Sequence, residues 1–216
     1  FHESKRFGFF PSVGLAWSLS NEKFWEPLKE TVNNMRVRLT YGLVGNDAIG
    51  SSTDRFFYLS NVNMSYSGYA STFGKESNYT RNGINISRYA NPDITWETSR
   101  KTNLALEMGL LGKINIQADL FKERRTNILM SRADIPSTMG LTSPVRANIG
   151  EASARGVDVS VDISHSFSPK LWLQSRGNFT FATNQYEVYE EPVYDKEWWR
   201  SRVGYPINQQ WGYIAE

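Results

Sequence analysis

Two-residue alternation is the feature of this sequence that most restricts its fold. Between Met35 and Leu43, large apolar side chains occupy every second position, and polar or small side chains fill the positions between them. Because a β-strand sends successive side chains to opposite faces, this pattern predicts a strand with one apolar face. The same alternation predicts six strands in all. They cover residues 12–19, 35–43, 102–110, 114–120, 157–163 and 171–181.

The apolar faces of these predicted strands carry no charge. Charged residues make up 21% of the chain, so several would fall on these positions by chance. A lipid-facing Arg or Lys at the midplane of a bilayer costs about 2–4 kcal/mol, whereas a face that lines a lumen tolerates charge. Exclusion of charge from one face is therefore typical of a membrane-spanning sheet. The opposite faces hold Arg36, Arg38, Glu107, Asp119, Asp158, Asp162 and Arg176.

The connections between the predicted strands alternate in length. Residues 111–113 and 164–170 form short turns, and residues 20–34 form a third connection, in which Ser20 to Lys23 open a helical turn. The other connections are long, at residues 44–97, 121–155 and 183–204. Short turns at one end and long loops at the other are typical of an outer-membrane β-barrel, whose sheet closes because the bilayer core offers no water to its backbone. A soluble β-sandwich also has alternating strands and remains the alternative.

The predicted strands are too few for a whole barrel. Six strands, with a possible seventh starting near Tyr205, fall short of the eight in the smallest bacterial single-chain barrels. The chain also begins on an apparent strand run at residues 7–10. We therefore predict an all-β fold: an antiparallel transmembrane β-barrel segment of about six to seven strands with long extracellular loops. Residues 1–216 form one partial barrel domain whose outer strands lack partners. Trp17 and Trp96 are candidates for the aromatic girdle at the membrane surface.

Six segments in a fixed order carry a resemblance to a known family. They are residues 9–17, 35–46, 91–99, 118–126, 148–158 and 203–206. Together they resemble the barrel of SusC/RagA-like TonB-dependent outer-membrane transporters of Bacteroidetes. The resemblance implies an outer-membrane location, a barrel around an N-terminal plug domain, a SusD-like surface lipoprotein as partner, and uptake of oligosaccharides or peptides driven by TonB. The sequence holds no plug and no TonB-box segment, so the TonB contact is expected through a missing N-terminal region.

The composition argues against an enzyme and against nucleic-acid binding. The chain has no cysteine and two histidines, His2 and His165, and it carries none of the common hydrolase, metalloprotease or phosphate-loop motifs. Its 24 basic and 22 acidic residues lack the excess of positive charge that a polyanion requires. We therefore predict no catalytic residues, no cofactor and no metal.

Aromatic side chains crowd two of the long connections. Exposed rings stack on sugar faces and anchor protein interfaces, so they are candidates for contact with substrate. Packing of the loops against each other, or a place in the aromatic girdle, remains the alternative for the same rings. The candidate substrate-binding residues are Tyr58, Tyr66, Tyr69, Tyr189, Trp198 and Trp199.

Two further functions remain open on the sequence alone. A soluble β-sandwich carbohydrate-binding module would use the same loop aromatics as a platform, and a passive porin-like or adhesin barrel would share the strand pattern. Outer-membrane lipids are an expected partner in the barrel interpretation. The basic run of Lys122, Arg124 and Arg125 is expected at the outer rim, where it either contacts anionic lipopolysaccharide or is simply solvated.

Overall fold

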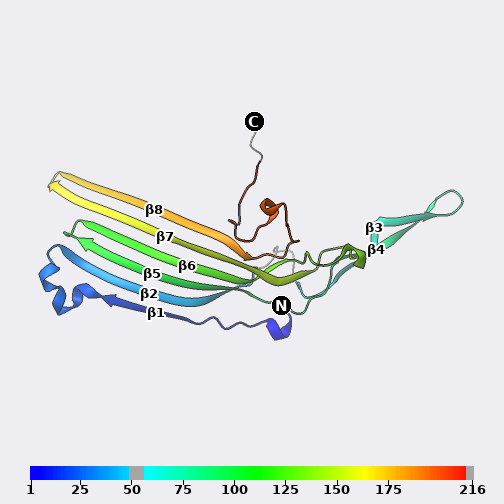
Figure 1. Ribbon diagram of the computed structural model, residues 1–216, viewed down its shortest axis with the longest axis horizontal. Helices are drawn as coiled ribbons and strands as arrows, with labels where there is room; N and C mark the ends of the chain where they lie inside the picture. The colour runs from blue at the N-terminus through cyan, green and yellow to red at the C-terminus, as the bar shows by residue number, and fades with distance from the viewer. Residues whose placement is uncertain (49–55, 213–216) are drawn as a thin grey trace.

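The computed structural model describes residues 1–48 and 56–212, which form one long curved antiparallel sheet and a separate hairpin (Figure 1). The large sheet has six strands in the order β1-β2-β5-β6-β7-β8, and β3 pairs with β4 alone. The strands are β1 Ser12–Ser18, β2 Val32–Asn46, β3 Asn61–Phe73, β4 Tyr79–Arg88, β5 Glu97–Leu110, β6 Ile114–Ser131, β7 Arg146–Ser168 and β8 Leu171–Val188. The predicted all-β antiparallel fold is confirmed.

The helices are short and 3-10 in type. They are η1 Glu3–Lys5, η2 Leu19–Asn21, η3 Lys23–Leu28, η4 Ser137–Met139 and η5 Trp198–Arg200. Helices η2 and η3 confirm the helical turn predicted in the connection after the first strand. In the part of the chain that the structure describes, no helix has the length and apolar character needed to cross a membrane.

Most strands run beyond the limits that the apolar pattern predicted. β6 has 18 residues and β7 has 23, and their ladder continues past Lys122, which pairs with Arg155. The physical reason is that backbone hydrogen bonds hold the ladder together whether or not one face is apolar. Apolar alternation therefore marks only part of each strand, and the remainder carries polar side chains on both faces.

Three predictions made from the sequence are wrong. The predicted loop over residues 44–97 contains the β3–β4 hairpin, in which apolar residues alternate only over short stretches, at Val62, Met64 and Tyr66 in β3 and at Ile84 and Ile86 in β4. Residues 7–10 are not a strand, because the Phe10 ring leaves the sheet edge and packs 5.5 Å from that of Trp96. No strand begins at Tyr205 within the described residues; Pro206 follows it, and Val203 makes only an isolated bridge to Tyr186.

The two ends of the sheet differ as the connection lengths predicted. The η2–η3 connection and the turns after β5 and β7 lie together at one end (Figure 1). The β3–β4 hairpin, the connection over residues 132–145 and the segment after β8 leave from the other end. We refer to these as the short-turn end and the long-loop end.

The sheet has no conventional hydrophobic core. Among the described residues, only Ile94, Ala105 and Ala152 are buried apolar residues. Large side chains of the apolar face stay exposed, including Leu15 at 71% and Phe179 at 60%. A β-sandwich would bury these side chains against a second layer. The described chain supplies no such layer, so the sandwich alternative is not favoured.

Candidate functional site

One face of the sheet is a continuous apolar surface. The strand register places Leu39 of β2 between Leu15 of β1 and Leu104 of β5, and the same row continues through the next three strands. We call this surface the apolar belt. It consists of the alternate residues within 13–17, 35–43, 104–110, 114–120, 157–163 and 171–181.

The height of the apolar belt matches that of a bilayer. On β8 it extends from Leu171 to Phe181, ten residue steps along the strand. At about 3.3 Å per residue this is roughly 33 Å along the strand, or about 25 Å along a barrel axis to which strands tilt by 35–45°. The apolar band of outer-membrane barrels is about 25 Å tall. A single strand of this sheet therefore suffices to cross the hydrocarbon layer.

The two girdle candidates lie toward opposite ends of the sheet, Trp17 at the end of β1 and Trp96 just before β5, and their place at a membrane surface stays a prediction. Trp17, toward the short-turn end, lies 6.4 Å from the ring of Phe24, and its Nε1 donates to Glu22 at 3.0 Å. Trp96, at the long-loop end, packs on Phe10 and donates from Nε1 to the carbonyl oxygen of Lys5 at 3.2 Å. Both indoles thus present an apolar ring with a satisfied polar edge, which suits a membrane surface.

The opposite face carries paired charges. Arg36 Nη1 lies 3.4 Å from Glu107, and Arg38 Nε lies 2.9 Å from the same carboxylate. The Arg38 contact is ionic, because its N–H is not aligned for a hydrogen bond. Arg38 also lies 4.0 Å from Asp119. The polar, mutually paired inner face that alternation predicted is thereby confirmed.

Nearer the long-loop end, the inner face continues with Arg125. Its Nε donates to Glu123 at 2.8 Å, and its Nη1 lies 3.5 Å from Glu97. The prediction that Arg125 shares the outer rim with Lys122 and Arg124 is therefore wrong. Alternation places residue 125 on the face opposite to its even-numbered neighbours.

The segment after β8 folds back beside the long-loop end and encloses a cavity of about 720 Å³. Arg132, just after β6, donates from Nε to Glu190 Oε2 at 2.6 Å. Ser201 and the backbone N–H of Arg202 donate to Glu191 at 2.6 and 3.0 Å. The bond from Arg132 holds the segment to the end of β6, and the bonds to Glu191 close the segment on itself. We call this space the loop cavity; its aromatic lining is Tyr189, Tyr194, Trp199, Tyr205 and Trp211.

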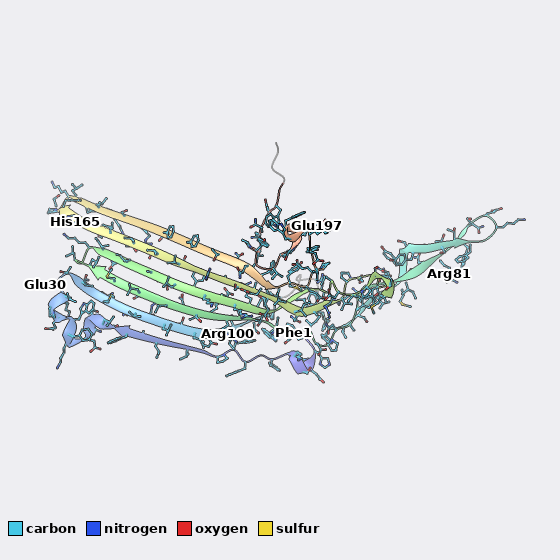
Figure 2. The ribbon with its side chains drawn as sticks, viewed as in Figure 1. Phe1, Glu30, Arg81, Arg100, His165 and Glu197 are labelled. Carbon is cyan, nitrogen blue, oxygen red and sulfur yellow. The ribbon has the colours of Figure 1, made fainter. Side chains whose placement is uncertain are left out.

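The structure brings together half of the predicted aromatic residues. Tyr189 and Trp199 line the loop cavity, and Trp198 packs edge-on against Trp199 at 6.0 Å. Tyr66 and Tyr69 instead contact each other, 5.2 Å apart, on the hairpin that projects away from the large sheet (Figure 1). The side-chain view shows the same separation between Glu197, near the loop cavity, and Arg81 on the hairpin (Figure 2).

The remaining candidate, Tyr58, lies 5.8 Å from the ring of His2, in a third place. Sequence reasoning missed Tyr205 and Trp211, which pack edge-on at 5.2 Å within the loop cavity. Pro206 could have indicated their position in the sequence. A proline next to Tyr205 argues against a strand there and favours a turn that brings the segment back.

One acidic group of the loop cavity, Glu190, has a shifted pKa. Partial burial raises the pKa of Glu190, but the hydrogen bonds from Arg132 and from the backbone N–H of Asp134 outweigh it and lower the pKa below its ordinary value. The same pair raises the pKa of Arg132. Hydrogen-bonded carboxylates set among aromatic rings suit contact with a polar ligand. Across residues 1–48 and 56–212, no cluster of three or more His, Asp or Glu side chains is placed to hold a metal ion.

Comparison with known proteins gives one consistent result. The profile of the family described as "TonB dependent receptor-like, beta-barrel" matches residues 2–210. The chain is 24% identical over its whole length to TonB-dependent receptor P3 of Formosa agariphila, and 28% identical over 86% of its length to TonB-dependent receptor SusC of Bacteroides thetaiotaomicron. It spans about a fifth of the length of these relatives, at 20% and 18%.

Solved structures give the same fold. The RagAB peptide importer in its closed-closed state superimposes with a TM-score of 0.72 at 20% identity, covering 95% of this chain and 21% of that chain. Its open-open state gives a TM-score of 0.71 at 21% identity, with the same coverage. At this identity the likeness concerns the fold.

Proposed function

Because the chain belongs to the TonB-dependent receptor-like β-barrel family, we propose that it forms part of the barrel wall of an outer-membrane nutrient transporter. The observation that carries this proposal is the apolar belt: a charge-free face, of bilayer height, that no described part of the chain covers. Hydrocarbon is the environment in which such a face is stable. The short-turn end then faces the periplasm and the long-loop end the cell surface.

In this proposal the described residues form one section of a larger, closed barrel. The outer edges of β1 and β8 have free backbone groups in the six-stranded sheet, and further strands would pair with them. The charged inner face, with Arg36, Arg38 and Glu107, faces the barrel interior and a plug domain. TonB acts through that plug, and a SusD-like surface lipoprotein covers the long-loop end. The relatives named SusC and the RagAB structures support this arrangement.

The substrate class in this proposal is oligosaccharide or peptide. The loop cavity supports it, since the rings of Tyr189 and Trp199 line it together with Glu190. Tyr189 and Trp199 are the substrate contacts that we propose within the loop cavity, and Trp198, which packs against Trp199, is a proposed contact beside it. Tyr58, Tyr66 and Tyr69 are proposed contacts on the surface of the loops, away from that cavity.

A test of the belt uses the absence of cysteine from this chain. Single cysteines at Val37, Arg38, Leu39 and Thr40 of the full-length protein, with other cysteines replaced, are labelled with a fluorophore in lipid vesicles. Brominated lipid chains should quench the label strongly at Val37 and Leu39 and weakly at Arg38 and Thr40. Equal quenching at all four positions would contradict the proposal.

A second test concerns transport itself. Cells that lack the full-length protein should lose uptake of either labelled oligosaccharides or labelled peptides, and cells that lack TonB should lose the same uptake. Restoring the protein with Trp199→Ala should weaken uptake, whereas Phe73→Ala, on the hairpin and outside the loop cavity, should not. Unchanged uptake of both substrate classes without the protein would refute the transport function.

A further inference from the structure

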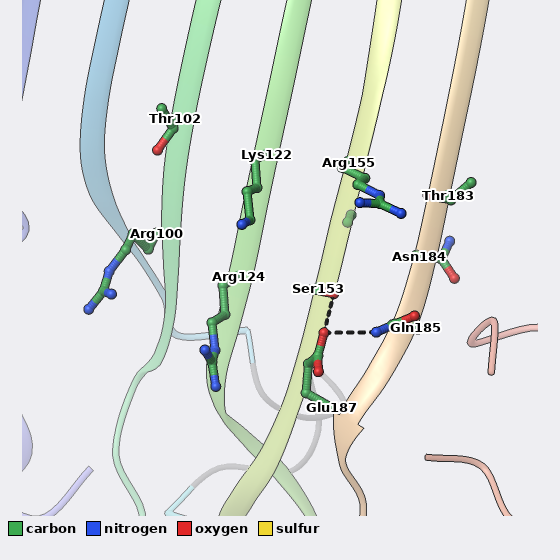
Figure 3. Close-up of a pocket in the computed structure, with 11 residues that line it drawn as sticks. Arg100, Thr102, Lys122, Arg124, Ser153, Arg155, Thr183, Asn184, Gln185 and Glu187 are labelled. Carbon is green, nitrogen blue, oxygen red and sulfur yellow. Dashed lines mark hydrogen bonds between the residues drawn. The ribbon is translucent and has the colours of Figure 1, made fainter. Parts of the chain in front are cut away.

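The outward face of the sheet turns basic directly beyond the apolar belt. The belt row that contains Leu120 is followed, toward the long-loop end, by a row with Lys122 and Arg155, and then by a row with Arg100 and Arg124. The four basic residues come from three neighbouring strands, β5, β6 and β7, and their side chains share one surface (Figure 3). We call these four residues the basic cluster.

Like charges stand directly opposite each other in the basic cluster. Arg100 pairs with Arg124 across β5 and β6, and Lys122 pairs with Arg155 across β6 and β7. Directly opposed like charges on one face of a sheet destabilise it. An anion placed between them would remove that cost.

The acidic side chains nearby do not neutralise the basic cluster. Within the described residues, Arg124 is the one member that makes an ion pair, to Glu151 at 2.6 Å. The carboxylate of Glu187 instead accepts from Ser153 Oγ at 2.5 Å and from Gln185 Nε2 at 3.0 Å (Figure 3). Four basic groups against two acidic ones leave a positive excess.

The basic cluster lies at a definite depth. The row of Lys122 and Arg155 continues to Thr183 of β8, twelve residue steps from Leu171 at the short-turn limit of the belt. This is about 40 Å along the strand and roughly 30 Å along the barrel axis, given the usual tilt, which lies beyond the apolar band of about 25 Å. The cluster therefore lies at the lipid headgroups of the leaflet nearer the long-loop end. There the cost of Lys and Arg falls to about 0–1 kcal/mol.

The surroundings of the basic cluster suit a phosphate group. A cavity of about 470 Å³ lies over it, and Thr102 and Thr183 add hydroxyl donors to its lining, whereas Ser153 and Gln185 are engaged with Glu187 at the same cavity. Guanidinium groups bind phosphate oxygens through two parallel N–H bonds, and a Lys ammonium supplies a compact charge beside them.

We propose that the basic cluster binds the phosphate of an anionic outer-leaflet lipid, a phosphorylated glycolipid of the lipid A class, whose acyl chains lie along the apolar belt. This assignment rests on the outer-membrane location proposed above. The proposal depends on two neighbouring surfaces: the basic cluster, which keeps a positive excess, and the exposed apolar belt directly beside it. A single ligand with a charged head and apolar tails complements both surfaces.

Native mass spectrometry of the full-length protein in detergent tests the proposal, with lipid A, dephosphorylated lipid A and inorganic phosphate as separate probes. The double variant Lys122→Gln/Arg155→Gln should bind lipid A at least tenfold more weakly than the unmodified protein. The matched control Lys75→Gln/Arg81→Gln removes the same charge from the exposed hairpin and should bind as the unmodified protein does. The swap Lys122→Arg/Arg155→Lys keeps the charge and should keep the binding.

Three results would overturn the proposal. Equal affinity for dephosphorylated lipid A would mean that the belt alone holds the lipid. Inorganic phosphate binding as tightly as lipid A would mean a site for a free anion. Equal loss of binding in the charge-keeping swap would mean that the double variant damages the fold. The quenching test at Val37 to Thr40 measures whether the belt lies in the membrane and does not depend on the basic cluster. It therefore shows whether the proposed function fails independently of whether the lipid site fails.

Discussion

A single arginine in the apolar belt offers the sharpest test of the membrane interpretation. Leu39 of β2 lies between Leu15 and Leu104, in the belt row next to that of Lys122, and is 46% exposed. In the bilayer this exposed fraction faces hydrocarbon, at a depth between the midplane and the headgroups. The cost of Arg on the lipid face falls from about 2–4 kcal/mol at the midplane to about 0–1 kcal/mol near the interfaces, so Leu39→Arg should destabilise the folded barrel by about 1–2 kcal/mol. That corresponds to a loss of roughly 5- to 30-fold in the folding equilibrium.

The neighbouring positions supply the controls. Thr40→Arg adds the same charge one residue further along, on the inner face, and should change stability little. Tyr41→Arg adds it on the belt face but nearer the basic cluster, at the limit of the belt, where the cost should fall to about 0–1 kcal/mol. The expected order of destabilisation is Leu39→Arg, then Tyr41→Arg, then Thr40→Arg.

The assay is urea unfolding of the full-length protein from short-chain phosphatidylcholine vesicles, followed by tryptophan fluorescence and by the shift of the folded band on gels without heating. Equal losses of stability for Leu39→Arg and Thr40→Arg would refute the reasoning. If only one face of the sheet contacts hydrocarbon, a charge must cost more on that face than on the other. A loss confined to Thr40→Arg would reverse the assignment of inner and outer faces.

The remaining predictions concern the inner face and the loop cavity. Gly156→Ala should destabilise the sheet by about 1–3 kcal/mol in the same unfolding assay, because its Cβ would collide with the backbone carbonyl oxygen of Phe181 and stand 2.6 Å from the Phe121 ring. Gly177→Ala, with open space around it, should be neutral or slightly stabilising. The lowered pKa of Glu190 means that its bond to Arg132 stabilises the loop cavity above about pH 4.3 and is lost as the pH falls through the lower folded-state value. Limited proteolysis of residues 189–212 should therefore accelerate in acid for the unmodified protein, and Glu190→Gln should be cleaved faster at neutral pH with a flatter pH dependence.

The sequence predicted the fold wherever one face of a strand meets lipid. Alternation identified all six strands of the large sheet, because a charge facing hydrocarbon is costly. It missed β3 and β4, whose side chains are mostly exposed and whose apolar alternation is confined to short stretches. It also ended β6 too early and began β7 too late, because those parts of the two strands lack a sustained apolar face.

The sites were less predictable because they depend on register and on loop packing. The run at residues 122–125 contributed Lys122 and Arg124 to the basic cluster, but Arg100 and Arg155 join them only through strand pairing. Trp211 lies well after β8 in the sequence, and it reaches the loop cavity only because the segment after β8 folds back. No local pattern carries that information.

The length of β6 has a consequence for how a partner approaches this protein. Past Lys122, at the level assigned to the lipid headgroups, the strand continues for nine residues to Ser131. In the proposed orientation this raises the wall by roughly 20 Å above the headgroups. A surface lipoprotein or a large nutrient would thus meet the protein wall roughly 20 Å above the headgroups, before it reaches lipid.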